Sequence, residues 1–310
     1  MDLTVRRARG ADVDRVRAFT SDTWPDREVG DYVGDAMEEW TRADRADRLT
    51  LVCEAAGTVV GVVRGALLTD HEAWASGLRV APDHRDEGVG TRLTRAVLAW
   101  ARDRGASVCR NLVFSWNAPS LGLSRLTGFE PCASVRFVSV EADAGAGNDP
   151  GTDRTDARPD DGWAFWSGSD ARTALRGLAL DAAEPWAVSE LTRERLHDAA
   201  ADDRLVTVGG DGTRGVTCRV RTRRYREDGP LLAEYAVGAW ADPAAAGRLL
   251  DAVRRDAAAA GADRGRVLVP EGVRWATDAA SAHAALDDAP HFLLAADLAA
   301  VDPAAEAASW

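Results

Sequence analysis

The sequence contains no lysine, since all 38 of its Lys or Arg residues are arginine. This absence excludes enzymes that depend on a lysine amine, such as nucleotide-binding proteins with a Walker-type phosphate loop, protein kinases and pyridoxal-phosphate enzymes. Asp and Glu number 50, which gives a formal charge of −12 and an isoelectric point near 5.0. Sequence-independent binding of nucleic acid requires an excess of cations at the phosphates. We therefore expect no nucleic-acid partner.

Cysteines and long apolar runs are also few. Four cysteines, Cys53, Cys109, Cys132 and Cys218, lie far apart without a C-x-x-C pair, and the five histidines are scattered. This spacing predicts free thiols in the core and no metal site. The first 17 residues carry charges throughout, and no run of 18 apolar residues follows. We expect a cytoplasmic protein with no membrane partner.

The excess of acidic residues, the missing lysine and the abundant Ala and Arg are typical of salt-loving organisms with GC-rich genomes. In such cells concentrated cations screen the repulsion within an acidic surface. We predict that the melting temperature rises steeply between low salt and molar KCl. Thermal melts across a KCl series test this, and a flat response would remove the halophile interpretation.

The 310 residues suffice for two domains of about 150 residues each. Residues 143–162 are almost free of apolar side chains and rich in Asp, Gly, Pro, Ala and Thr, which predicts a flexible linker between domains 1–142 and 163–310. The two domains resemble each other, because Arg92-Leu93 recurs as Arg248-Leu249, 156 residues later. Two further dipeptides recur at the same offset. We interpret the chain as two copies of one unit.

The first copy alternates strand and helix patterns, which predicts an α+β fold. The clearest helix follows Gly90, because an apolar stripe recurs at helical spacing from Leu93 to Ala101 and Gly105 ends it. The predicted strands are residues 3–8, 49–54, 59–68, 72–80, 108–116 and 133–140, and the other predicted helices are residues 12–24, 29–43 and 119–126.

A strand that leads into Arg85-Asp86-Glu87-Gly88-Val89-Gly90 and then into an amphipathic helix has the properties of a diphosphate site. Glycines without Cβ atoms let an anion approach the backbone, and the N–H groups and dipole of the helix attract it. Arg85 and Arg92 can add full charges. An ordinary glycine-rich turn is the alternative interpretation.

The context of this loop resembles the GNAT superfamily of N-acetyltransferases. Leu78-Arg79-Val80-Ala81-Pro82 precedes an R-x-x-G-x-G signature at residues 85–90, and Asn117 and Gly128-Phe129 follow. The resemblance covers roughly residues 3–140. It implies a mostly antiparallel mixed sheet flanked by helices, acetyl-CoA as co-substrate, and direct transfer of acetyl to an amine in a ternary complex. The amine is that of a small molecule or a protein.

The resemblance also implies roles for individual residues. Backbone groups of Leu78 and Val80, where the fourth strand splays from the fifth, would bind pantetheine, and the Val80 N–H would polarise the thioester carbonyl. Asn117 would contact the pantetheine arm, with Ser120 nearby. The pyrophosphate would be held by Arg85, Asp86, Glu87, Gly88, Val89, Gly90 and Thr91.

Acetyl transfer requires a base for the amine and an acid for the leaving thiolate. The resemblance makes Glu72, at the start of the fourth strand, the candidate catalytic base, although a surface carboxylate explains it equally well. His71 and His84 are further candidates. The family often places a tyrosine as the acid where this chain has Ser124, and a serine hydroxyl is a much poorer acid. This departure bears on catalysis more than on cofactor binding.

The sequence says less about the acceptor amine than about the cofactor. Acidic residues in the second helix suggest a cationic amine, although a solvated acidic face is the commoner explanation. These residues are Asp31, Asp35, Glu38 and Glu39. A non-catalytic acyl-CoA sensor or interaction module is the alternative function, and a structural protein that keeps only the fold is a third. The sequence carries no signal for the oligomeric state.

The second copy repeats the pattern in weaker form. Its predicted elements are a strand at 163–166, helices to about 201, strands at 205–208, 216–221 and 231–240, and a helix at 244–260. The positions of Arg85, Gly88 and Gly90 are taken by Ala241, Ala244 and Ala246. The chain thus resembles tandem GNAT proteins in which one repeat has lost the cofactor. We expect this domain to be structural or to shape the acceptor pocket.

Overall fold

The computed structural model describes residues 2–21, 23, 31–42, 46–147, 158–210, 212–225 and 228–300. By its contacts the chain divides into two compact units. Unit 1 comprises Met1–Val113, Asn117–Pro131 and Leu294–Trp310, and unit 2 comprises Phe114–Trp116 and Cys132–Leu293.

This division differs from the predicted boundary at residue 142. Strand β6 (Glu130–Glu141) lies mostly in unit 2, because it pairs with β13 (Arg264–Pro270) from Glu141↔Arg264 to Val135↔Pro270. Pairing between segments so far apart in the chain leaves no mark in local composition. The predicted linker at 143–162 lies partly outside the described residues, and its last residues begin helix α5 (Pro159–Ser167).

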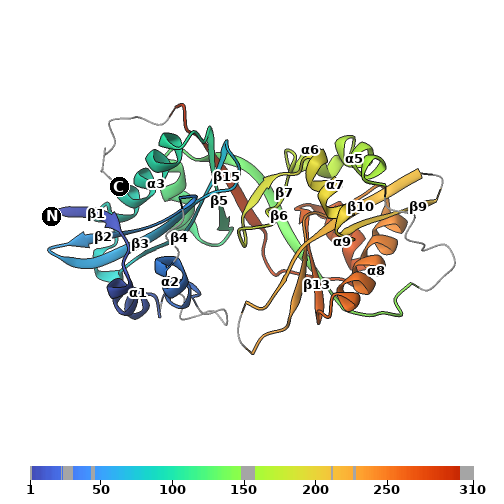
Figure 1. Ribbon diagram of the computed structural model, residues 1–310, viewed down its shortest axis with the longest axis horizontal. Helices are drawn as coiled ribbons and strands as arrows, with labels where there is room; N and C mark the ends of the chain where they lie inside the picture. Colours follow the sequence, from blue (N-terminus) through green and yellow to red (C-terminus); the bar gives the residue numbers. More distant parts are fainter. Residues whose placement is uncertain are drawn as a thin grey trace. The chain divides into compact units, whose positions relative to one another are not determined.

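Unit 1 is built on a mixed, mostly antiparallel sheet. Strands β1 to β4 pair in sequence order and antiparallel, and β5 joins β4 in parallel. In Figure 1 helices α1 and α2 lie on one face of this sheet and α3 on the other. The elements are β1 (Leu3–Arg7), α1 (Val13–Thr20), α2 (Val33–Arg42), β2 (Arg48–Ala55), β3 (Thr58–Leu67), β4 (Glu72–Val80), α3 (Val89–Asp103), β5 (Val108–Phe114) and α4 (Ala118–Leu126).

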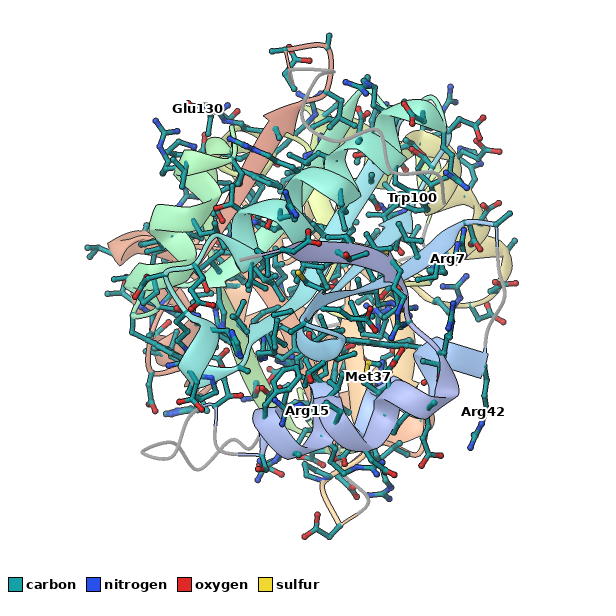
Figure 2. All side chains as sticks on the ribbon, turned by 90° about the vertical axis from the view of Figure 1, so that its left-hand side faces the viewer. Arg7, Arg15, Met37, Arg42, Trp100 and Glu130 are labelled. Carbon is teal, nitrogen blue, oxygen red and sulfur yellow. The ribbon has the colours of Figure 1, made fainter. Side chains whose placement is uncertain are left out.

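The core of unit 1 follows the predicted apolar pattern. The stripe on α3 is buried, with Leu93, Val97 and Trp100 fully covered. On the opposite face Met37 of α2 is also fully buried, and Figure 2 labels Met37 and Trp100 on the two sides of the sheet. Strands β2 and β3 are buried nearly throughout, as expected for strands covered on both faces. The sequence pattern therefore predicted this unit well.

In unit 2 the strands pair in the order β6-β13-β11-β10, with β9 and β12 beside β10 and β14 beside β6. The remaining elements are α5, α6 (Asp170–Ala174), β7 (Leu178–Leu180), β8 (Val188–Glu190), α7 (Arg193–Ala201), β9 (Leu205–Gly210), β10 (Gly212–Arg223), β11 (Leu232–Tyr235), β12 (Ala239–Trp240), α8 (Pro243–Ala259), α9 (Val273–Ser281), β14 (Ala285–Leu286) and β15 (His291–Asp297). No helix in the described ranges combines the length and apolar character needed to span a bilayer.

Three predictions for unit 2 were wrong. The segment 163–166 is helical, because Pro159 stands in the first turn of α5 and Asp160 and Asp161 favour a helix start there. The predicted strand 231–240 is interrupted between β11 and β12. The helical stretch predicted up to about residue 201 is interrupted by strands β7 and β8. Strands β9 and β10 and helix α8 confirm the predictions for 205–208, 216–221 and 244–260.

An aromatic cluster lies in the core of unit 2. His291 is 4% exposed and its ring packs 5.1 Å from Phe114, 5.5 Å from Phe137 and 5.9 Å from Trp186, measured between centroids. Its Nε2 is 4.0 Å from Oδ2 of Asp287. Burial, reinforced by nearby arginines, lowers the pKa of His291 to about 4.

The lowered pKa of His291 predicts acid sensitivity of folding. The folded protein binds fewer protons than the unfolded chain between pH 6.5 and about 4, so stability falls as pH falls through this window, by up to about 3 kcal/mol. Asp287 acts in the opposite direction, because burial raises its pKa. Urea unfolding of wild type and His291→Gln from pH 7 to 4 isolates the histidine. Equal pH slopes for both proteins would contradict the prediction.

Candidate functional site

The site predicted in unit 1 centres on an opening between β4 and β5. Their parallel pairing runs only from Glu72↔Val108 to Trp74↔Arg110. In the described residues, β4 beyond Trp74 is paired with β3 alone. The splay that the family resemblance implied is therefore present, and one edge of β4 faces an opening in the sheet.

A bulge at Gly77 decides which backbone groups of β4 reach this open edge. The register with β3 shifts between Val62 and Arg64, and Gly77 has φ +64°. A Cβ at Gly77 would lie 2.7 Å from the Trp40 ring, so both conformation and packing require glycine. The sequence analysis missed the bulge, although a glycine inside a strand is its usual signal.

Past the bulge, Leu78 and Val80 turn their backbone groups to the open edge. The Ala81 N–H donates to the Val60 carbonyl at 2.8 Å, and Arg79 is paired with Val62. Residues of an antiparallel pair alternate between the two edges of a strand. Leu78 and Val80, the two residues predicted to bind pantetheine, are thus the ones whose N–H and C=O groups are available there.

The loop after β4 leaves the start of α3 open. Gly88 is the N-cap of α3 in the left-handed conformation, with φ +84°, and the cap makes no side-chain hydrogen bond. The first turn contains no acidic residue. The N–H groups of Val89, Gly90 and Thr91 therefore have no intrahelical acceptors, and the helix dipole adds positive potential. This is the geometry of an anion-binding helix start.

The charged side chains of the loop differ in orientation. Arg85 is exposed, and its side chain makes no hydrogen bond or ion pair with the described residues, while its backbone N–H donates to the Pro82 carbonyl at 3.3 Å. Glu87 is held by His84, whose Nδ1 lies 2.8 Å from its Oε2, while Asp86 is exposed with φ +63°. Arg92 donates to the Leu3 carbonyl on β1. The prediction that Arg92 supplements the anion site was therefore wrong, because its side chain is turned to β1.

Gly90 lies where α3, α4 and the open edge meet. A Cβ there would be 2.9 Å from Cδ2 of Leu123 on α4 and 3.8 Å from the side chains of both Leu78 and Val80. The sequence analysis attributed this glycine to room for the anion. The structure adds that it permits close approach of Leu123.

Helix α4 brings the other predicted cofactor residues together. Asn117 is its N-cap, and Oδ1 of Asn117 accepts from the Ser120 N–H at 3.3 Å. Ser124, where the family often has tyrosine, is 5% exposed, and its Oγ accepts from Nδ2 of Asn111 on β5 at 3.0 Å. The contacts of Asn117 and Ser120 with a cofactor stay predictions.

Glu72 has a geometry that does not favour its predicted role as base. It is 1% exposed, and its Oε1 lies 2.5 Å from Nη1 of Arg110. It stands at the paired end of β4, eight residues or roughly 26 Å of strand from Val80. A buried carboxylate in such an ion pair is poorly placed to accept a proton from an incoming amine. His71 is exposed, and His84 is paired with Glu87.

The acidic residues in and just before α2 do not form one free surface. The side chain of Asp31 is 1% exposed and ion-paired with Arg79 at 2.5 Å. Glu38 is paired with Arg42 at 2.7 Å and Arg17 at 3.4 Å. Three of the four residues, Asp35, Glu38 and Glu39, are exposed, but Glu38 is engaged in these ion pairs.

The start of α8 in unit 2 is closed by its own cap. Asp242 is the N-cap of α8 and accepts from the Ala245 N–H at 2.8 Å. Its ion pair with Arg214, together with this N–H, holds the pKa of Asp242 below its usual value. An ionised carboxylate thus occupies the position of an anion at this helix.

The strand opening of unit 2 is also filled. The Gly238 N–H donates to the Leu268 carbonyl of β13 at 2.8 Å. The buried Trp240 donates from Nε1 to Asp278 at 2.9 Å, and Arg274 at the start of α9 donates to the Ala241 carbonyl at 3.0 Å. Side chains of unit 2 itself therefore close the gap that remains open in unit 1.

Comparison with known proteins decides the family of unit 1. Residues 13–129 match the model of the acetyltransferase (GNAT) family. The family match therefore lies almost entirely within unit 1, and we refer to this matched part as the GNAT domain. The protein is therefore an acyltransferase, and its GNAT domain combines an open β4 edge with an uncapped α3.

Two curated relatives match part of the chain. An aminoglycoside N(6′)-acetyltransferase of Stenotrophomonas maltophilia is 29% identical over 156 residues, which are 46% of this chain and 96% of the relative. A streptothricin acetyltransferase of Streptomyces lavendulae is 33% identical over 104 residues, 32% of this chain. The matched part covers about half of the streptothricin acetyltransferase, 53% of its length.

One solved structure resembles the fold of nearly the whole chain. A GCN5-related N-acetyltransferase from Sphaerobacter thermophilus has a TM-score of 0.58 and 16% identity, covering 96% of each chain. At this identity the likeness concerns the fold alone.

Proposed function

We propose that the protein transfers acetyl from acetyl-CoA directly to an amine in a ternary complex. The observation that carries this proposal is the open β4 edge leading to an uncapped α3, with Arg85 as an unpaired cation beside it. Acetyl-CoA supplies the acetyl group as an activated thioester. Direct transfer depends on the two reactants being held side by side, and needs no covalent enzyme intermediate.

Each part of the site has a proposed task. The first-turn N–H groups of α3 and Arg85 bind the pyrophosphate. The edge groups of Leu78 and Val80 bind the pantetheine, and the Val80 N–H polarises the thioester carbonyl. The predicted ligands Asp86, Glu87, Gly88, Val89, Gly90 and Thr91 lie in this loop, while Asn117 and Ser120 are at the start of α4.

We infer that the acceptor is the amine of a small molecule. The two curated relatives are named for aminoglycoside and streptothricin acetylation, and the exposed Asp35 and Glu39 on α2 favour a cationic acceptor. A protein amine remains the alternative acceptor. The cytoplasm as location and a halophilic source are part of the same proposal and rest on composition alone.

Release of free CoA with a panel of amines tests the proposal. An aminoglycoside, a streptothricin and an α-amino peptide should be assayed with acetyl-CoA in molar KCl. We expect amine-dependent CoA release for at least one small-molecule amine. Binding of acetyl-CoA without release for any amine would support the alternative, a non-catalytic acyl-CoA sensor.

We also propose that unit 2 is a degenerate second copy of the GNAT unit and binds no acetyl-CoA. The self-capped α8 and the filled strand gap support this proposal. So does the order of strands and helices from β9 to α9, which parallels the order from β2 to α4.

A further inference from the structure

Arg79 lies on β4 between the two residues proposed to bind pantetheine. The side chains of Leu78 and Val80 point to the α3 side, where both approach Gly90. Arg79 points to the opposite side, where its Nε and Nη2 donate to the two carboxylate oxygens of Asp31 at 2.5 and 3.0 Å. This bidentate pair is well shielded, with side-chain exposures of 13% and 1%.

The same guanidinium reaches back to the open edge. Nη1 of Arg79 donates to the Leu78 carbonyl at 2.9 Å. That carbonyl is one of the groups that the bulge at Gly77 turns away from β3. The charge of Arg79 therefore fixes the orientation of a peptide group on the proposed cofactor edge.

Asp31 is itself fixed to the start of α2. Its Oδ1 accepts from the Val33 N–H at 3.0 Å, in addition to the bonds from Arg79. The carboxylate thus links the beginning of α2 to the Arg79 side chain of β4 and, through this side chain, to the Leu78 carbonyl. Bidentate, charge-assisted bonds of this kind define geometry as well as energy.

We propose that Asp31 and Arg79 are positioning residues for acetyl transfer. They hold the Leu78–Val80 edge so that its groups meet the acetyl end of acetyl-CoA in a productive orientation. This inference rests on the proposed function. The loop 85–91 binds the diphosphate independently of the Asp31–Arg79 ion pair. Loss of this ion pair therefore affects the position of the acetyl end of acetyl-CoA more than the overall affinity for the cofactor.

The experiment compares Asp31→Asn, Arg79→Gln and the double variant with wild type, well below their melting temperatures. We expect kcat to fall about 10- to 100-fold, as misplacement of reacting groups does, while the Kd of CoA changes less than about threefold. The kcat of the double variant should be no lower than that of the more impaired single variant, because each substitution removes the same Asp31–Arg79 ion pair. Calorimetry without an acceptor should show that wild type binds acetyl-CoA more tightly than CoA and that all three variants lose this preference.

Asp12→Asn is the matched control. Asp12 is buried, binds both Nη atoms of Arg6 at 2.8 Å and accepts from the Arg9 N–H at 2.7 Å, but lies at the start of α1. The Asp12→Asn variant should lose about as much stability as Asp31→Asn, while its kcat stays unchanged. Unchanged kcat and unchanged acetyl-CoA preference in Asp31→Asn, or an equal fall of kcat in Asp12→Asn, would overturn the positioning role. Failure of wild type to bind acetyl-CoA would instead reject the proposed function.

Discussion

Replacing Gly90 with valine is expected to lower acetyl-CoA affinity at least 100-fold while the protein stays folded. The Cβ alone would lie 2.9 Å from Cδ2 of Leu123 and 3.8 Å from the side chains of Leu78 and Val80. The two additional methyl groups of valine must then enter the space between the start of α3 and the open edge. Titration calorimetry with acetyl-CoA measures the loss, and circular dichroism tests folding.

Gly122→Ala is the control for this prediction. Gly122 lies on α4, one residue before Leu123, and a Cβ there meets nothing within 4 Å. Alanine favours helix by about 1 kcal/mol over glycine, so this variant should keep its affinity and gain some stability. Unaltered acetyl-CoA affinity in folded Gly90→Val would contradict the placement of the cofactor beside α3.

Replacing Arg110 with methionine is expected to destabilise the protein by about 3 kcal/mol or more. The change leaves Glu72, 1% exposed, without the guanidinium that lies 2.5 Å from its Oε1. An ionised group in the interior that loses a charged partner keeps its desolvation cost. Urea unfolding at pH 7 measures the loss, and Glu72→Gln combined with Arg110→Met should recover much of it.

The same pair tests whether Glu72 is a base. A glutamine at position 72 can still accept from Arg110, so Glu72→Gln should keep kcat within a few-fold and leave the pH–rate profile unshifted. If Glu72 were the catalytic base, its removal would instead lower kcat by about 10²–10⁴-fold and abolish the corresponding limb of the pH–rate profile. That second result would restore Glu72 to the catalytic role that the family resemblance implied.

Much of the GNAT domain could be predicted from local sequence. The apolar stripe from Leu93 to Ala101 and the strand 72–80 match α3 and β4 in the structure. The helix was predicted to follow Gly90, and in the structure it begins at Val89 with Gly88 as its N-cap. These features depend on periodicity and on glycine positions, both of which are local.

The features that were missed depend on long-range partners. Asp31 looked like part of an exposed acidic face, but Arg79, 48 residues later, buries it. Glu72 looked accessible until Arg110 was placed beside it. The boundary of unit 1 differed from the prediction because β6 pairs with β13. No local pattern reports which distant side chain or strand will meet a given residue.

The number of acetyl-CoA molecules bound per chain tests the central claim most directly. Titration calorimetry of the intact protein in molar KCl should give one site per chain, and none for the variant carrying both Arg85→Ala and Gly90→Val. Two sites would contradict the assignment of unit 2 as closed by Asp242 and Arg274. No binding to the folded wild-type protein would contradict the acetyl-CoA site at β4 and α3.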